Sequence, residues 1–154
     1  YSVASKEYVY RMYDTAGSDP FMRSRAWHLK RPITDEGISR MREAAEYVVG
    51  RHDFTSFMAS GSKITDATRT VYSLSVERAS GAIEIRISAD GFLYNMVRII
   101  AGTLVDCAYG VIEPCELEEI IASCDRGRAG RTAPPDGLYL ADVRYGCAID
   151  WKIF

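Results

Sequence analysis

One arginine interrupts an otherwise apolar stretch of this chain, "DGFLYNMVRIIAGTLVD" at residues 90–106. Arg98 is the only charged residue between Gly91 and Val105. Burying a guanidinium is costly unless a carboxylate or a phosphate pairs with it. Alternatively, the long stem of an arginine carries its charge to water past apolar neighbours. Arg98 is therefore either a candidate anion-binding residue or a surface residue of a core helix.

The stretch around Arg98 predicts a helix that packs against a core. At about 3.6 residues per turn, one face collects six apolar residues. These are Leu93, Met96, Val97, Ile100, Leu104 and Cys107. Arg98 falls on the other side, inside a second apolar stripe. The stretch is too short and too often interrupted to span a membrane. Gly102 costs about 1 kcal/mol against alanine in mid-helix, which suggests that another backbone passes close by.

The remaining segments predict the elements that must position this helix. Alternating residues predict strands at 7–14, 68–79, 80–90 and 137–146, and periodic apolar residues predict helices at 33–50 and 113–124. Thr34 is the expected N-cap of the first helix, whose inner face carries Ile38, Met41, Ala45 and Val48, and Gly50 is its expected end. Residues 79–81 are the expected turn of a hairpin. Residues 126–137 form the one loop rich in Gly, Pro and Arg.

The order β-α-β-β-α-(α)-β matches the ferredoxin-like, split βαβ arrangement of the α+β class. We expect one domain over residues 1–154, with an antiparallel sheet of about four strands and helices on one face. The opposite face is expected to carry Tyr8 and to form the open floor of a cleft. One edge strand is expected to lack a partner within the chain.

Composition narrows the possible functions. The net charge of −2 argues against a protein that coats nucleic acid by bulk charge. The four cysteines show no CxxC spacing and there are two histidines, so no metal site is expected. Such cysteines are typical of a reducing, cytoplasmic setting. The first residues show no basic region followed by an apolar run, so no secretory signal is expected.

Four segments resemble the TruA-type tRNA pseudouridine synthases. "SKEYVYRMYD" is similar to the family's basic-x-Tyr-x-Tyr strand, and "GRHDFTSFMASGS" to its Gly-x-x-Asp-Phe-x-x-Phe segment. "GFLYNMVRIIAGTLVDCAYG" is similar to its Phe-x-x-x-Met-Val-Arg-x-x-x-Gly helix, and "TAPPDGLYLADVRY" to its Thr-Ala-x-x-x-Gly-Leu-x-Leu ending. Together they run from Lys6 to Tyr145. In that family they lie in the C-terminal half of the catalytic protein.

The resemblance implies an isomerase that converts uridine to pseudouridine in the anticodon stem-loop of tRNA, without cofactor or metal. The family's catalytic aspartate stands in a Gly-Arg-Thr-Asp segment of the N-terminal half, which this sequence does not contain. The triplet Gly130-Arg131-Thr132 is followed by Ala133, so it does not supply that aspartate. We therefore expect the chain to be inactive alone. Its expected partners are tRNA, the N-terminal half of the same protein and a second copy in a homodimer.

The resemblance also implies roles for single residues. Arg98 would pair with the catalytic aspartate, and Tyr8 would stack on a uracil flipped from its helix and assist proton transfer. Gly137 and Leu138 would form an apolar wall of the base pocket. Without the resemblance, Tyr8 is an ordinary sheet tyrosine and Leu138 an ordinary core leucine. Phe54 and Phe57 are expected core anchors, with Asp53 and Ser56 as capping or turn residues.

Contacts to RNA phosphates require basic side chains. The expected RNA-binding residues are Lys6, Arg23, Arg25, Arg69 and Arg128, and the wider set of basic candidates adds Arg11, Lys30, Arg31, Arg126 and Arg131. An alternative function is a non-catalytic RNA-binding module of ferredoxin-like shape. That alternative is weakened because the aromatic RNP pattern is absent from the strands. A regulatory or assembly domain would suit the net charge but would not explain Arg98.

Overall fold

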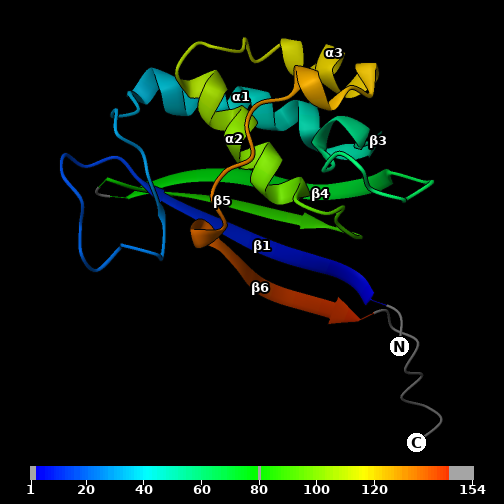
Figure 1. The fold of residues 1–154 in the computed structure, drawn as a ribbon, viewed down its shortest axis with the longest axis horizontal. Helices are drawn as coiled ribbons and strands as arrows, with labels where there is room; N and C mark the ends of the chain where they lie inside the picture. The colour runs from blue at the N-terminus through cyan, green and yellow to red at the C-terminus, as the bar shows by residue number, and fades with distance from the viewer. Residues whose placement is uncertain (1–2, 80, 146–154) are drawn as a thin grey trace, which may run out of the picture.

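The computed structural model describes residues 3–79 and 81–145, which form one sheet with helices on a single face (Figure 1). The predictions that involve Ser80, Gly146 and Cys147 lie outside the described residues. The strands are β1 Val3–Tyr13, β2 Trp27–His28, β3 Gly50–Asp53, β4 Thr68–Ala79, β5 Ala82–Ala89 and β6 Leu138–Tyr145. The helices are α1 Asp35–Val48, α2 Met96–Ala108 and α3 Glu116–Ser123, with single turns η1 Thr55–Phe57, η2 Arg126–Arg128 and η3 Pro135–Gly137.

The sheet has the order β2-β1-β5-β4-β3, with β6 also paired to β1. Strand β6 pairs with residues Val3 to Tyr10 of β1, and β2 pairs with the last two residues of β1. The β1–β2 pair is parallel, so the expectation of a wholly antiparallel sheet was wrong and the sheet is mixed. The cause is the loop at 14–26, which brings the chain back in the direction of β1. The ring of His28 stacks on the ring of Tyr13, with 4.4 Å between the ring centroids, and this contact holds β2 beside β1.

Strand β6 has no second partner strand in the described part of the chain. Leu140 and Tyr145 on this strand are 55% and 59% exposed. Strand β6 is therefore an edge strand whose outer side has no partner among the described residues, as expected. An exposed edge of this length offers a row of backbone donors and acceptors to another strand.

The helices form as their sequence patterns predict. The Thr34 hydroxyl accepts a hydrogen bond from the Gly37 amide at 3.0 Å and caps α1. The predicted inner face of α1 is buried throughout. The helix ends at Val48, with Val49 as its C-cap, and Gly50 follows at φ +115° as the expected stop. Gly50 is also the first residue of β3. The strand β3 was not predicted, since four residues carry too little alternation.

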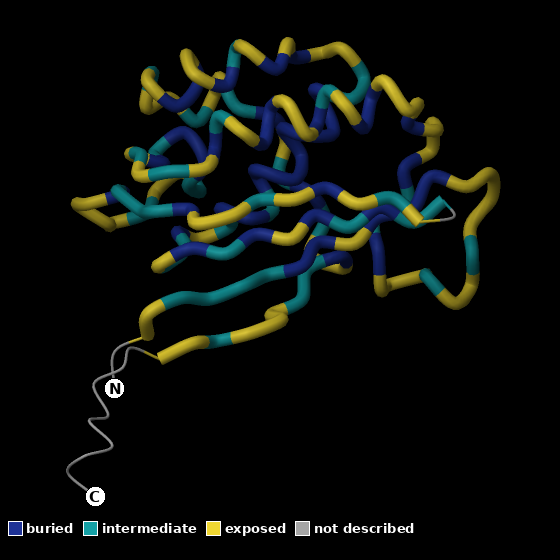
Figure 2. Tube along the Cα trace, turned by 180° about the vertical axis from the view of Figure 1, so that it is seen from behind, coloured by how far each residue is buried: buried dark blue, intermediate teal, exposed yellow. Residues whose placement is uncertain are grey.

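The core lies between the helices and the sheet, where buried residues concentrate (Figure 2). The predicted inner face of α2 is fully buried, and Phe54 and Phe57 are core anchors as expected. Asp53 accepts hydrogen bonds from the amide and hydroxyl of Thr55, which confirms a turn. Ser56, by contrast, is buried and donates to the Ile120 carbonyl at 2.6 Å. It joins η1 to α3 rather than capping a local turn.

Gly102 confirms the predicted close approach of another backbone. A Cβ atom at this position would overlap the carbonyl oxygen of Arg131. Gly130 is equally constrained, because its added Cβ would lie 2.7 Å from the Cα of Thr103. The loop at 126–137 therefore lies directly against α2.

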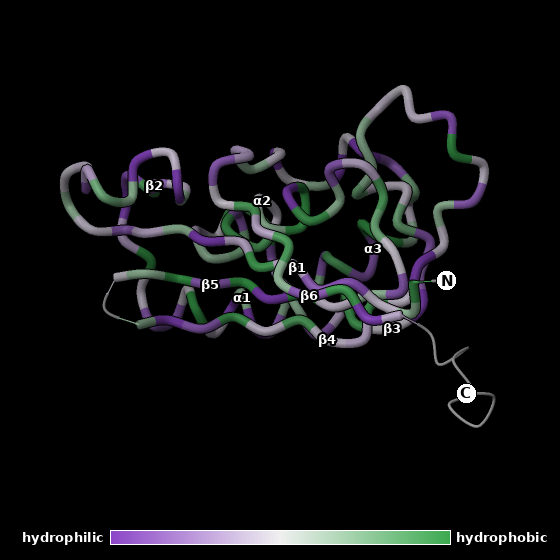
Figure 3. Tube along the Cα trace, turned by 90° about the horizontal axis from the view of Figure 1, so that it is seen from below, coloured by the Kyte–Doolittle hydropathy of each residue, from purple (hydrophilic) through white to green (hydrophobic). Residues whose placement is uncertain are grey.

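The expected position of Tyr8 was wrong. Alternate residues of a strand share a face, and Tyr8 shares its face with Tyr10 and Met12, both fully buried beneath the helices. The opposite face is polar and carries ion pairs such as Arg11–Glu84 at 2.9 Å. Seen from below, the strands alternate between hydrophilic and hydrophobic residues (Figure 3). In the described residues, none of the helices combines the length and apolar character needed to cross a membrane.

A buried ion pair closes the base of the loop that follows β1. Asp14 accepts hydrogen bonds from Arg78 at 2.8 and 3.2 Å and from the Ile33 amide at 2.8 Å. Burial acts to raise the pKa of Asp14, but the hydrogen bonds and the charge of Arg78 outweigh it, so the pKa is lowered. Through Asp14 and Ile33, the pair joins both ends of the segment at residues 14–33 to Arg78 of the β4–β5 hairpin.

This pair predicts a stability that is lost in acid. Because the folded-state pKa of Asp14 lies below its unfolded value of about 3.9, the stabilisation is complete above that value and falls as the pH drops through the folded-state pKa. We expect Asp14→Asn to lower the free energy of unfolding at pH 7 by about 3 kcal/mol and to flatten its decline below about pH 4. Urea denaturation across pH measures both effects.

The control is Asp136→Asn, since Asp136 is exposed and makes no ion pair in the described residues. If the free energy of unfolding of Asp14→Asn declined below about pH 4 as steeply as that of the wild type, the assigned role of the pair would be contradicted.

Candidate functional site

Three elements far apart in sequence line one hollow on the helix-bearing side of the sheet. Tyr8 comes from β1, Arg98 from α2 and Leu138 from β6, and the hollow measures about 520 Å³. Its other lining residues are Phe92, Leu93, Tyr94, Asn95, Met96, Val97 and Pro135. Three of the four residues that the sequence predicted for the catalytic and base-binding sites therefore lie together.

Gly137 does not line the hollow but determines where Leu138 lies. Gly137 is buried, and an added Cβ would overlap the Arg11 carbonyl oxygen and lie 2.9 Å from the Cζ of Tyr10. Only a residue without a side chain lets the backbone cross β1 so closely. The next residue, Leu138, then begins β6 at the wall of the hollow.

Arg98 is half-buried and is held by two neutral acceptors. Its Nε donates to the Ala133 carbonyl at 2.7 Å and its Nη1 to the Asn95 side-chain oxygen at 3.0 Å. The amide of Ala133 donates in return to the Arg98 carbonyl at 2.9 Å. In the part of the chain that the structure describes, no carboxylate lies within ion-pair distance of Arg98. The guanidinium is thus oriented while its Nη2 makes no hydrogen bond to these residues.

The backbone before α2 explains the position of Asn95. This residue adopts a left-handed conformation with φ 63°, which asparagine tolerates better than most residues. Its carbonyl accepts the hydrogen bond from Ile99, while its side chain is left for Arg98. The role of Asn95 was not predicted. The i, i+3 spacing of an amide and an arginine is the only signal that could have indicated it.

The walls of the hollow suit a planar ring. Tyr8 is half-buried and packs edge-on against Phe92, with 5.0 Å between the ring centroids. Its hydroxyl makes no hydrogen bond within the described residues. Leu138 and Pro135 add apolar surface. The hollow therefore combines flat apolar walls with one fixed cation, a composition typical of small-molecule and base-binding sites.

Tyr10 lies beneath the hollow and packs in the core, as expected. It is fully buried, and its hydroxyl donates to the Pro134 carbonyl at 2.6 Å. Burial raises the pKa of Tyr10 well above its usual range, against the opposing charge of Arg98. The phenol stays neutral and supports the loop that holds Arg98.

The five predicted RNA-binding residues do not form one surface. Lys6 and Arg69 lie near the end of β5, since Lys6 pairs with Ala89 and the Arg69 side chain contacts Gly91. Arg23 and Arg25 lie in the loop at the other end of β1. Arg128 lies beside α3, where it pairs with Glu119 at 3.6 Å. Their role in RNA binding stays a prediction.

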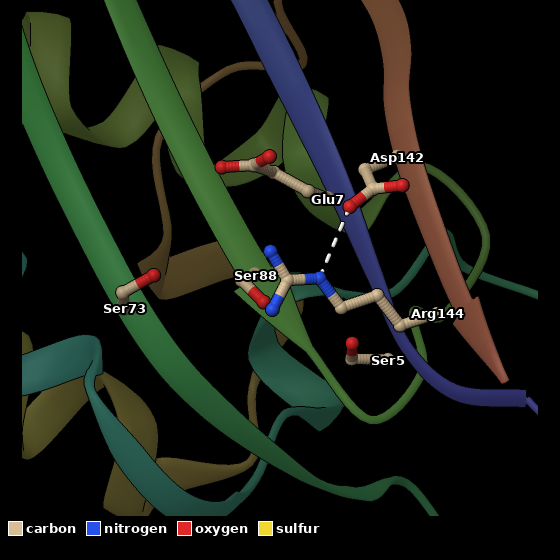
Figure 4. Close-up of a pocket in the computed structure, with 6 residues that line it drawn as sticks. All are labelled: Ser5, Glu7, Ser73, Ser88, Asp142 and Arg144. Carbon is tan, nitrogen blue, oxygen red and sulfur yellow. Dashed lines mark hydrogen bonds and ion pairs between the residues drawn. The ribbon is translucent and has the colours of Figure 1, made fainter. Parts of the chain in front are cut away.

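A second, smaller hollow lies on the open face of the sheet (Figure 4). It measures about 190 Å³ and is lined by Ser5, Glu7, Ser73, Ser88, Asp142 and Arg144. Arg144 donates to Asp142 at 3.1 Å, and Arg86 lies 3.7 Å from Glu7. Its charges pair with one another and it has no apolar wall, so it is the weaker candidate. Among the described residues, no group of three His, Cys, Asp or Glu is placed to hold a metal ion.

Comparison with known proteins shows the family to which the chain belongs. The sequence model of the family described as tRNA pseudouridine synthase matches residues 44–146, which include α2, the loop at 126–137 and β6. The chain belongs to this family. The match covers Arg98, Gly137 and Leu138, while Tyr8 lies outside it.

Curated tRNA pseudouridine synthases match a longer part of the chain. The protein named tRNA pseudouridine synthase A of Thermoanaerobacter sp. (strain X514) is 46% identical over 145 residues, and that of Bacillus subtilis (strain 168) is 44% identical over 145 residues. The protein of the same name from Acetivibrio thermocellus is 42% identical. Each match covers 94% of this chain and 58% of the relative, so the chain spans less than two thirds of their length.

Tyr8 and Tyr10 of β1 give a matched test of the contact that supports the site. Tyr10→Phe removes the hydrogen bond to Pro134 and should lower the free energy of unfolding by about 1 kcal/mol. Tyr8→Phe should leave stability unchanged, because the Tyr8 hydroxyl has no partner in the described residues. Urea denaturation of both variants measures the difference. Equal stabilities would show that the Tyr10–Pro134 bond does not hold the loop.

Proposed function

We propose that the full-length protein converts uridine to pseudouridine in tRNA, and that the Tyr8–Arg98–Leu138 hollow receives the base. One observation carries the proposal: Arg98 is oriented in a hollow with flat apolar walls beside Tyr8, while no acid of the described chain pairs with it. The anticodon stem-loop is the proposed target and the cytoplasm the proposed compartment. No observation favours the non-catalytic RNA-binding alternative.

The reaction detaches uracil from C1′ of its ribose, turns the base and rejoins it through C5. The nucleotide must leave its helical stack before the base can enter the hollow. The half-buried ring of Tyr8 and the side chain of Leu138 would hold the flat base, while the free Tyr8 hydroxyl is available for proton transfer. Arg98 would bind the catalytic carboxylate and keep it ionised through a guanidinium fork.

The proposed carboxylate comes from a part of the full-length protein that this chain does not span. Two observations support this proposal. The relatives are longer than the match, and the outer edge of β6, beside the hollow, has no partner strand among residues 3–79 and 81–145. We propose that the strands β6-β1-β5-β4 are the ferredoxin-like half of a pseudouridine synthase and that a second half extends the sheet from β6. Assembly as a homodimer is part of the same proposal.

Tritium release from tRNA labelled at C5 of uridine tests the function directly. The full-length protein should release tritium, because C5 loses its hydrogen when it bonds to C1′. The chain 1–154 alone should release none above background, since it lacks the proposed acid. Release by the isolated chain would mean that a carboxylate of this chain performs the chemistry, and no release by either would refute the proposed function.

Substitution of Arg98 in the full-length protein tests its role. Arg98→Met should reduce the single-turnover rate by at least about 100-fold with little change in melting temperature, because Met fills similar volume without charge. Arg98→Lys should fail almost as badly, since a point charge does not reproduce a fork. Arg86→Met, on the open face of the sheet, is the control. Near-normal turnover of Arg98→Met, or loss of activity only through unfolding, would make Arg98 a packing residue.

A further inference from the structure

A basic groove lies on the far side of the segment that holds Arg98. It measures about 530 Å³ and forms between β2 with the residues after it, the end of α2 and the loop at 126–137. Its lining residues are Trp27, His28, Leu29, Lys30, Arg31, Tyr109, Val111 and Arg131. Three of these eight side chains are cations at neutral pH, and Trp27 and Tyr109 add two aromatic rings.

The two arginines of the groove lie on the faces of its two aromatic rings. The Cζ of Arg31 is 4.2 Å from the ring centroid of Tyr109, and the Cζ of Arg131 is 5.4 Å from that of Trp27. A stacked guanidinium uses its flat face and keeps its in-plane N–H groups for an anion. Each ring has one face covered by a guanidinium, and on that side the groove offers N–H donors.

Few acceptors among the described residues form hydrogen bonds with the basic side chains of the groove. No hydrogen bond or ion pair there involves the side chains of Lys30 or Arg31. Arg131 has one acidic neighbour, Asp106, at 3.5 Å. The groove therefore has a net positive charge that its own residues do not neutralise.

The groove is ordered before any ligand binds. The Tyr109 hydroxyl donates to the Arg31 carbonyl at 2.5 Å, and the Leu29 amide donates to the Tyr13 carbonyl at 2.8 Å. Both bonds involve backbone atoms of the segment that carries the cations. A prearranged cluster of cations reduces the entropy lost when a phosphate binds.

We propose that this groove binds the phosphodiester backbone of tRNA close to the target uridine. Arg131 lines the groove and Pro135 lines the hollow, so the two sites lie on one segment. Four residues span at most about 14 Å, which a few nucleotides can bridge at about 3.4 Å of rise each. A strand whose uracil enters the hollow would then place neighbouring phosphates in the groove. The proposal rests on the proposed function and deepens it.

The test uses the full-length protein and tRNA, with Lys30→Gln/Arg31→Gln as the variant. Its Kd for tRNA should rise at least about 10-fold, and the slope of log Kd against log salt should fall by about 1 to 2, because up to two phosphate contacts are lost. The bond from Tyr109 survives, since it is made to the backbone of Arg31. Arg31→Lys keeps the charge and should keep most of the slope.

The matched control is Arg51→Gln/Lys63→Gln, which removes the same charge from two exposed residues outside the groove. It should leave both Kd and slope close to the wild-type values. Equal effects of the two double variants in a protein that forms pseudouridine would overturn the groove and leave the proposed function standing. A wild-type protein that neither binds tRNA nor forms pseudouridine would overturn both.

Discussion

The reciprocal pair between Arg98 and Ala133 is the contact on which the arrangement of the site depends. The arginine side chain donates to the Ala133 carbonyl at 2.7 Å, and the Ala133 amide donates back to the backbone of Arg98 at 2.9 Å. These bonds join α2 to the segment that leads into β6. Gly102 makes the approach possible, because any side chain there would overlap the Arg131 carbonyl. Helix, loop and strand therefore hold their positions together, and with them Arg98 and Leu138.

One consequence is that a single short segment borders two different surfaces. Residues 131–135 contribute Arg131 to the basic groove and Pro135 to the apolar hollow, while Ala133 and Pro134 accept hydrogen bonds from Arg98 and Tyr10. A shift of this segment would change both surfaces at once. A chain with a net charge of −2 can in this way present a local basic surface beside a binding hollow.

The sequence predicted the long elements because their signals are local. The cap at Thr34, the apolar face of α2 and the role of Gly102 all follow from residue types at fixed spacings. The parallel strand β2 was not predicted, and the predicted face of Tyr8 was wrong. Both features depend on where distant segments pack. Among ten basic candidates, sequence alone gave no reason to prefer Arg31 or Arg131. In the structure, Arg31 and Arg131 each lie over an aromatic ring of the groove. The ring under Arg31 belongs to Tyr109, which is 78 positions away in the sequence.

The central claim is that Arg98 binds an acid supplied from outside this chain. The most direct measurement is the distance, in a crystal structure of the full-length protein, between the Arg98 guanidinium and the nearest carboxylate oxygen. The account predicts an aspartate from beyond residues 1–154, within about 3 Å of the guanidinium N–H groups. It also predicts that the bonds from Arg98 to Ala133 and Asn95 are retained. An Arg98 that pairs with an acid of residues 1–154, or with no acid, would contradict the claim.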